Sequence, residues 1–266
     1  MQEDEKYKAE KRSDSINFLV YHCFALTTPQ MLELFIKSGT SVHYVIQRNG
    51  TILNLVEESD AAYHAGLSFW RGKQGLNGNS IGIELQNQKM GQQKYTKAQI
   101  NSLITLSQNI IKRYHIKAQN IVGHSDIAPM RKPDPAKFFP WEQLAENGIG
   151  IWPKIKKNTD YVSYSNKEIK HLLEKIGYDT NDVTAALYAF ITRFLPKKVT
   201  TQKDIINREA EVFAYWKNIK QTDVNSIIKD APAIYPSSAK LFLHDTEILA
   251  RLKQVAEAYE QENISG

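Results

Sequence analysis

A short proline-rich segment places the tightest limit on how this chain can fold. Residues 123–135 read GHSDIAPMRKPDP and contain three prolines. Proline fixes its own φ and pushes the residue before it toward extended conformations. The segment is therefore a stiff loop that can hold ligands at fixed angles without the support of a helix or strand. It carries His124 and Asp134, two side chains that bind zinc well.

Two ligands do not make a catalytic metal site. A catalytic zinc usually takes three protein ligands and keeps a fourth position for water, so a third ligand must come from elsewhere. Residues 16–24 are apolar, β-branched or aromatic almost throughout, which predicts a buried strand. His22 lies near the end of that strand and is the best source of the third ligand. The alternative is a core histidine whose ring is hydrogen-bonded to backbone.

A second strand supplies a carboxylate. Residues 79–87 are apolar except for a few positions, and Glu84 lies within the apolar run. A buried carboxylate is costly unless it is paired or functional. Beside a metal-bound water it can serve as a general base. The alternative is a glutamate on an exposed face of the strand.

Taken in order, these segments resemble the zinc-dependent N-acetylmuramoyl-L-alanine amidases of the amidase-2 superfamily. That group includes the bacterial AmpD and AmiD enzymes, phage lysozyme-like amidases and animal peptidoglycan-recognition proteins. The resemblance covers about residues 15–153. Its matching pieces are the strand that ends in His22, residues 41–50, 62–66 and 79–84, the 124–134 loop and residues 139–141.

The resemblance implies a role for each candidate residue. His22, His124 and Asp134 would hold one Zn²⁺ ion, and Glu84 would be the catalytic base. Lys132 would stabilise negative charge on the substrate oxygen. The alternative for Lys132 is a solvated surface lysine, the usual fate of this residue type.

The third ligand separates branches of the superfamily. Phage and animal members use cysteine there, so Asp134 places this chain with the AmpD/AmiD branch. Cys23 directly follows His22. Side chains of successive strand residues point to opposite faces, so Cys23 is not counted as a ligand.

Four further residues are candidates for substrate binding. His64 stands before an Ala-Gly pair and is expected beside the groove rather than on the metal. Trp70 and Arg71 suit a sugar face and a peptide carboxylate, although loop residues of this kind are often ordinary surface residues. Asn79 belongs to one of the matching pieces. His43 is expected to be structural, hydrogen-bonded within the sheet.

The first half of the chain alternates strand-like and helix-like segments. This order predicts an α/β fold, with a mixed β-sheet flanked by helices. Expected helices cover residues 29–39 and 96–114, and an expected hairpin joins 41–46 to 51–56. A short strand at 121–123 would deliver His124.

An all-α region follows. Residues 154–163 are polar and basic, which is typical of a linker. Helices are expected at 165–176, 181–194, 204–219 and 245–261. The first two are similar to small three-helix peptidoglycan-binding modules. The expected domains are a zinc amidase domain at 1–153, a peptidoglycan-binding-like module at 160–198, and a helical extension of unknown role at 199–266.

Composition sets weaker limits. The 266 residues are 42% hydrophobic and include one cysteine, which suits a globular chain without an internal disulfide framework. The formal net charge is +5, and the basic residues form no block in the sequence. We therefore expect no nucleic-acid partner. Residues 16–26 follow a leader of mixed charge with several acidic residues, and no small-residue cleavage site comes after them, so they predict a core strand rather than a signal peptide. We expect no transmembrane segment. The expected location is the cytoplasm, and the alternative is a periplasmic or envelope-associated location. The oligomeric state stays open.

The expected activity is zinc-dependent hydrolysis of the amide between N-acetylmuramic acid and L-alanine of the peptidoglycan stem peptide. A non-catalytic peptidoglycan-recognition protein is the main alternative, and loss of a ligand or of the base would favour it. A glycosidase would need two carboxylates about 5–10 Å apart. Glu84 has no evident acidic partner outside the metal set. Soluble muropeptides and the intact wall are equally compatible substrates.

Overall fold

The computed structural model describes residues 7–89, 91, 93–154, 164–199 and 233–265. The chain divides into two compact units. Within the described residues, the first unit comprises those of 7–68, 73–124 and 134–151. The second comprises Phe69–Gly72, Ser125–Pro133 and Trp152–Gly266.

A five-stranded mixed sheet forms the centre of the first unit. Its strand order is β4-β3-β8-β2-β9. The strands are β2 (Phe18–Phe24), β3 (Tyr44–Ile46), β4 (Ile52–Asn54), β8 (Ser80–Gln86) and β9 (Ile121–Gly123). β3, β8, β2 and β9 run parallel, and β4 joins the edge through an antiparallel hairpin with β3. The predicted α/β fold with a mixed sheet is confirmed.

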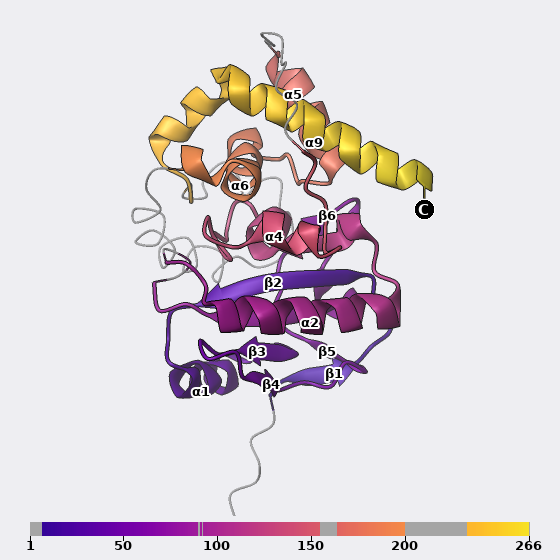
Figure 1. Cartoon of the computed structure of the whole chain (residues 1–266), viewed down its shortest axis with the longest axis vertical. Coiled ribbons are helices and arrows are strands. Elements are labelled where there is room, and N and C mark those ends of the chain that lie inside the picture. Colours follow the sequence, from indigo (N-terminus) through magenta and orange to yellow (C-terminus); the bar gives the residue numbers. More distant parts are fainter. Residues whose placement is uncertain (1–6, 90, 92, 155–163, 200–232, 266) are drawn as a thin grey trace, which may run out of the picture. The chain divides into compact units, whose positions relative to one another are not determined.

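Helix α2 (Lys97–Tyr114) covers one face of this sheet (Figure 1). Thr96 caps its first turn by accepting a hydrogen bond from the backbone N–H of Gln99. The Tyr21 hydroxyl of β2 donates to Ser107 of α2 at 2.8 Å, and the Gln99 amide donates to the Gln86 carbonyl of β8 at 2.8 Å. All seven residues of β2 are buried, as expected for a parallel strand that is covered on both faces.

Helix α1 (Thr28–Ser38) packs through Met31 against Phe24 and Val45. Phe24 lies two residues after His22 on β2, so both side chains point to the same face of the sheet. The helix ends at Gly39, whose φ of 65° lies in the left-handed region that favours glycine. The expected helix at 29–39 is confirmed.

The first unit also contains a small sheet that was not predicted. Its strands are β1 (Ala9–Lys11) and β5 (Asp60–Ala62), which pair antiparallel. β1 lies in the charged N-terminal segment, where the residues show no apolar alternation. The remaining elements are β7 (Lys73–Gln74), η1 (Leu76–Asn79), η2 (Ala118–Asn120) and α4 (Trp141–Glu146), and α3 (His124–Ile127) begins at the end of β9.

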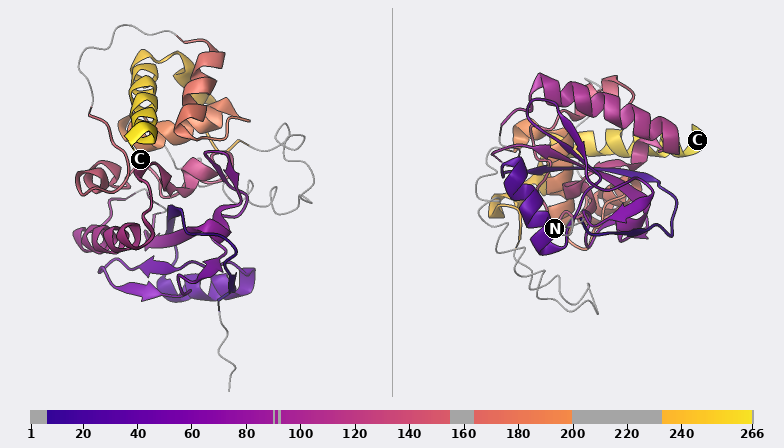
Figure 2. Two further views of the ribbon diagram at one scale, coloured as in Figure 1. Left: turned by 90° about the vertical axis from the view of Figure 1, so that its right-hand side faces the viewer. Right: turned by 90° about the horizontal axis from the view of Figure 1, so that it is seen from below.

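Helices dominate the second unit. They are α5 (Asn166–Ile176), α6 (Val183–Phe194), η3 (Pro196–Lys198), η5 (Ser237–His244) and α9 (Thr246–Ser265), with the short strand β6 at Phe69–Trp70. Helices α5 and α9 lie side by side (Figure 2), and Lys175 forms an ion pair with Glu260 at 2.7 Å between them. The helices expected at 165–176, 181–194 and 245–261 are confirmed, whereas 204–219 lies outside the described residues.

A buried ion pair holds the second unit together. The Arg193 guanidinium of α6 donates to Asp126 at 2.6 Å, and the Tyr178 hydroxyl donates to the other carboxylate oxygen at 2.7 Å. All three side chains are almost fully buried. The loop Ser125–Pro133 therefore groups with the helices, an arrangement that the sequence did not predict. Among the residues placed in the structure, no helix is both long and apolar enough to cross a bilayer.

Candidate metal centre and active site

Strand register places three candidate residues in a row across the sheet. Tyr21 of β2 pairs with Gly123, the last residue of β9, so the residues that follow them, His22 on β2 and His124 at the start of α3, come side by side. On the other side of β2, His22 pairs with Glu84 of β8. Neighbouring strands lie about 4.7–4.9 Å apart, and paired residues point to the same face. The row lies toward the carboxyl ends of the parallel strands, where open α/β sheets bind ligands.

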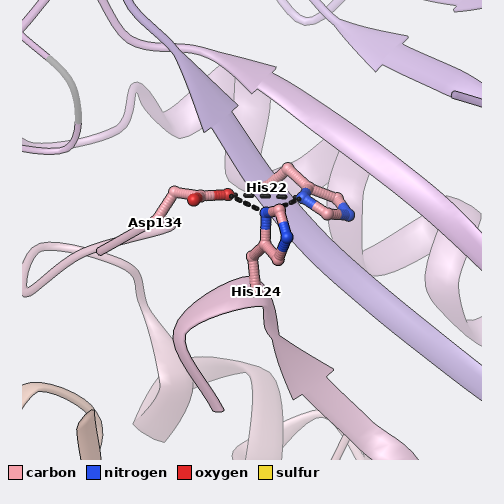
Figure 3. A group of neighbouring side chains, drawn as sticks. All are labelled: His22, His124 and Asp134. Atoms are coloured by element: carbon pink, nitrogen blue, oxygen red, sulfur yellow. Dashed lines mark hydrogen bonds and ion pairs between the residues drawn. The ribbon is translucent and has the colours of Figure 1, made fainter. Parts of the chain in front are cut away.

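His22, His124 and Asp134 converge on one point (Figure 3). The Nδ1 atoms of His22 and His124 are 3.0 Å apart. The Oδ2 atom of Asp134 is 3.3 Å from the first and 3.2 Å from the second. All three side chains are buried.

This triangle could hold a metal ion, and its dimensions are compatible with zinc. Ligands about 2.0–2.1 Å from a tetrahedral zinc lie about 3.3–3.4 Å from one another. The three measured separations come close to that value, and two imidazoles with one carboxylate form a donor set that suits zinc. Three protein ligands leave the fourth tetrahedral direction for water or substrate.

The backbone around Asp134 is fixed by its neighbours in the first unit. The Pro135 carbonyl accepts a hydrogen bond from the Tyr95 hydroxyl at 2.9 Å, and the Cys23 sulfur lies 3.8 Å from it. A Cβ at Gly123 would come within 2.6 Å of the Pro135 ring, so glycine leaves the space for this turn. Cys23 thus contacts the loop backbone, while the three converging atoms come from His22, His124 and Asp134.

Electrostatics favour an ionised Asp134. Burial alone would raise the pKa of its carboxyl group. The neighbouring imidazoles of His124 and His22 outweigh burial and hold the pKa well below its usual range. A carboxylate held ionised is ready to bind a cation.

Glu84 occupies an interior strand. β8 lies between β3 and β2, and Glu84 pairs with Val45 on one side and His22 on the other. Its side chain is half-buried. Glu84 is therefore on an interior strand and only partly exposed, and it stays a candidate base.

His64 lies directly behind His22. Its Nδ1 atom is 3.0 Å from His22 Nε2, and its Nε2 atom is 3.1 Å from the Ser80 hydroxyl. Burial, followed by the neighbouring imidazole of His22, lowers the pKa of His64 well below its usual range.

His43 has a structural position, as expected. The backbone N–H of Gly82 donates to its Nδ1 atom at 3.0 Å, and its Nε2 atom lies 3.1 Å from the Asp60 carbonyl. Arg12 lies 2.7 Å from the same Nε2 atom. Burial and the charge of Arg12 lower the pKa of His43 to about 4, so the ring is neutral near pH 7.

Comparisons with known proteins agree with this geometry. Residues 12–137 match the amidase-2 family, described as N-acetylmuramoyl-L-alanine amidase. The chain is 38% identical over 228 residues to Escherichia coli N-acetylmuramoyl-L-alanine amidase AmiD, which covers 76% of this chain and 83% of AmiD. The chain belongs to the N-acetylmuramoyl-L-alanine amidase family. The resemblance and the enzyme class that the sequence predicted are confirmed.

Other members of this amidase family support the assignment. Haemophilus influenzae 1,6-anhydro-N-acetylmuramyl-L-alanine amidase AmpD is 41% identical over 116 residues, which cover 43% of this chain and 61% of that protein. The structure of E. coli AmiD with anhydro-N-acetylmuramic acid-L-Ala-D-γ-Glu-L-Lys matches with a TM-score of 0.66 at 29% identity, covering 94% and 93% of the two chains. Pseudomonas aeruginosa AmpDh3 with an anhydromuramic pentapeptide matches with a TM-score of 0.57 at 33% identity, covering 68% of this chain and 84% of AmpDh3.

Three of the residues expected to bind substrate, Asn79, Trp70 and Arg71, differ from one another in their surroundings. Asn79 has a buried side chain at the end of η1 in the first unit. Trp70 is fully buried in the second unit, with its ring edge-to-face to Tyr178 at 5.0 Å. The Arg71 guanidinium donates to two backbone carbonyls at the end of α5, at 3.1 and 3.3 Å. A fully buried ring offers no face to a sugar, so this geometry gives no support to a substrate contact by Trp70.

Lys132 is half-buried in the second unit, and its backbone N–H donates to the Ala128 carbonyl at 3.0 Å. Three polar residues near the candidate metal site were not predicted from the sequence: Asn77, Ser80 and Tyr95. Ser80 had a signal, because it is a hydroxyl residue at the start of an apolar strand. Asn77 and Tyr95 carried no local sequence signal, because their hydrogen-bond partners, residues 64–65 and Pro135, are distant in the sequence.

Proposed function

We propose that this chain is a zinc-dependent amidase that hydrolyses the bond between the lactyl group of N-acetylmuramic acid and L-alanine of the stem peptide. The observation that carries the proposal is the buried triangle of His22, His124 and Asp134 with Glu84 in the paired position beside it. The AmiD and AmpDh3 structures named above hold anhydromuramic peptides, which supports the same substrate class here.

Zinc, when bound, lowers the pKa of its water to about 7 and polarises the substrate carbonyl. The two neutral imidazoles and one carboxylate would hold a single ion and leave a net positive charge at the site. Glu84 takes the proton of the attacking water and returns it to the leaving amine. A glutamate suits both steps because its carboxylate accepts the proton and the resulting acid can donate it.

Lys132 would add positive charge toward the amide oxygen as the oxygen becomes anionic. Residues 160–198, of which 164–198 are described, would form a module that binds peptidoglycan, and 199–266 a helical extension. The substrate would be a peptidoglycan chain or a muropeptide fragment, either in the cytoplasm or in the envelope.

Product analysis tests the bond that is cleaved. The zinc-loaded chain is incubated with an anhydromuropeptide and, separately, with sacculi, and the products are identified by mass spectrometry. The proposal expects a free peptide that begins with L-alanine and a glycan with intact glycosidic bonds. New reducing ends would instead identify a glycosidase, and binding without products would identify a recognition protein. Either outcome would overturn the proposal.

A further inference from the structure

A chain of hydrogen bonds runs behind the metal ligand His22. The Nε2 atom of His22 lies 3.0 Å from Nδ1 of His64. The Nε2 atom of His64 lies 3.1 Å from the hydroxyl oxygen of Ser80. That hydroxyl donates its own hydrogen to the Leu76 carbonyl at 2.5 Å. The chain of hydrogen bonds therefore ends at a carbonyl oxygen, which can accept a hydrogen but cannot donate one.

The direction of each bond follows from that end. Because the Ser80 hydroxyl gives its hydrogen to a carbonyl, its oxygen must accept from His64, so His64 carries its hydrogen on Nε2. The Nδ1 atom of His64 then offers a lone pair and accepts from Nε2–H of His22. His22 is left with an unprotonated Nδ1 atom, which is the atom in the metal triangle.

The second metal histidine is supported by the adjacent residue. The Nε2 atom of His124 lies 3.2 Å from the Ala65 carbonyl. A carbonyl only accepts, so His124 donates from Nε2 and presents an unprotonated Nδ1 atom to the metal triangle. Residues 64 and 65 thus face both imidazole ligands from behind.

The backbone of these two residues is held in turn by Asn77. Its side-chain oxygen accepts from the backbone N–H of His64 at 3.1 Å and of Ala65 at 2.7 Å. Gly82 leaves room for the His64 ring, because a Cβ there would lie 2.6 Å from it. The roles of Asn77 and Gly82 were not expected from the sequence.

We propose that His64 is a positioning residue: with the Ala65 carbonyl, and held by Ser80 and Asn77, it fixes the tautomer and the ring orientation of the metal histidines. This inference rests on the zinc site of the proposed function. It replaces the expected role of His64 in substrate binding with one exerted through His22. Loss of a hydrogen-bond partner of a metal-bound histidine typically weakens metal affinity about 10–100-fold.

Zinc affinity tests the inference without measuring activity. Competition with a chromophoric chelator gives the zinc Kd of the wild-type chain and of five variants. His64→Leu removes the acceptor for His22 and should raise the Kd about 10–100-fold. His64→Asn can present a side-chain oxygen near the former Nδ1 position and should recover most of the affinity. Asn77→Ala should raise the Kd, whereas Asn77→Asp, which keeps the acceptor oxygen, should raise it less.

Ser80→Ala and an NMR measurement cover the case in which the His64 variants do not fold. Ser80→Ala is a small change and should still weaken zinc binding several-fold. In the zinc-loaded wild-type chain, ¹⁵N imidazole shifts should report Nε2–H for His22, His64 and His124. An Nδ1–H tautomer of His64, or a Kd for folded His64→Leu within about twofold of the wild type, would overturn the inference. Failure of the wild-type chain to bind zinc would instead overturn the proposed function.

Discussion

His22 lies directly opposite Glu84 in the parallel pairing of β2 with β8. The pairing fixes a proposed metal ligand and a candidate base on neighbouring strands, so their separation depends on the sheet and not on a loop. Sites built on rigid elements hold their geometry more tightly than sites built on loops. The stiff loop that ends in Asp134 has only to deliver the third ligand.

Glu84→Gln should keep the metal and lose most of the turnover. The amide cannot take the proton of the attacking water, and general base catalysis is typically worth about 10²–10⁴-fold. Bound zinc, measured by elemental analysis, should stay at the wild-type level, whereas His22→Ala should lose it. Glu57→Gln, at an exposed position, is the matched control and should leave kcat unchanged. A Glu84→Gln chain of near-normal rate would move the base elsewhere.

Arg193→Met should destabilise the second unit strongly. The substitution leaves the Asp126 carboxylate buried without its guanidinium partner, which typically costs about 3–5 kcal/mol. The free energy of unfolding from denaturant titration measures the effect. Lys170→Met removes an exposed ion pair with Glu174 and serves as the control, because such pairs contribute little. Equal stability of the two variants would contradict the importance of the buried pair.

A chain that ends at Trp152 should lose stability and with it the hydrolysis of both soluble muropeptides and sacculi. Truncation removes Tyr178 and Arg193, the hydrogen-bond partners of Asp126, which lies in the loop between His124 and Asp134. Circular dichroism and both activity assays measure the result. Full activity on soluble muropeptides with poor activity on sacculi would instead make the helices a separable targeting module.

Acid should destabilise the chain partly through His43. Its pKa is about 4 in the folded chain and about 6.5 when unfolded, so the unfolded state binds the proton more readily. The stability that the neutral ring contributes, about 3 kcal/mol, is fully present above pH 6.5 and is lost as the pH falls toward 4. His43→Gln should show a shallower loss of unfolding free energy between pH 7 and pH 4.5 than the wild type. His171→Gln, on an exposed face of α5, should keep the wild-type slope, and an identical slope in His43→Gln would refute this account.

The sequence predicted those elements whose signals are local. The apolar run of β2 and the Thr96 cap with the helical stripe of α2 depend on neighbouring residues, and both were found where expected. The set of His22, His124 and Asp134 was predicted from a histidine near a strand end, a proline-stiffened loop with His and Asp, and the resemblance to a known family. Its role in binding zinc stays a prediction.

The remaining features depend on contacts between distant residues. His64 meets His22 across 42 positions, and Asp126 meets Arg193 across 67. No spacing rule connects such pairs, so the supports behind the metal ligands and the grouping of 125–133 with the helices were not predicted. Trp70 suggested a sugar contact by its chemistry, but its burial depends on Tyr178 and Tyr259, which lie far along the chain.

Zinc titration of a metal-free sample tests the central claim most directly. The chain is stripped with a chelator, its metal content is verified by elemental analysis, and cleavage of an anhydromuropeptide is followed as zinc is added. The account predicts no cleavage without metal and a linear rise in rate that ends at one zinc per chain. Full activity in the verified metal-free sample would contradict it.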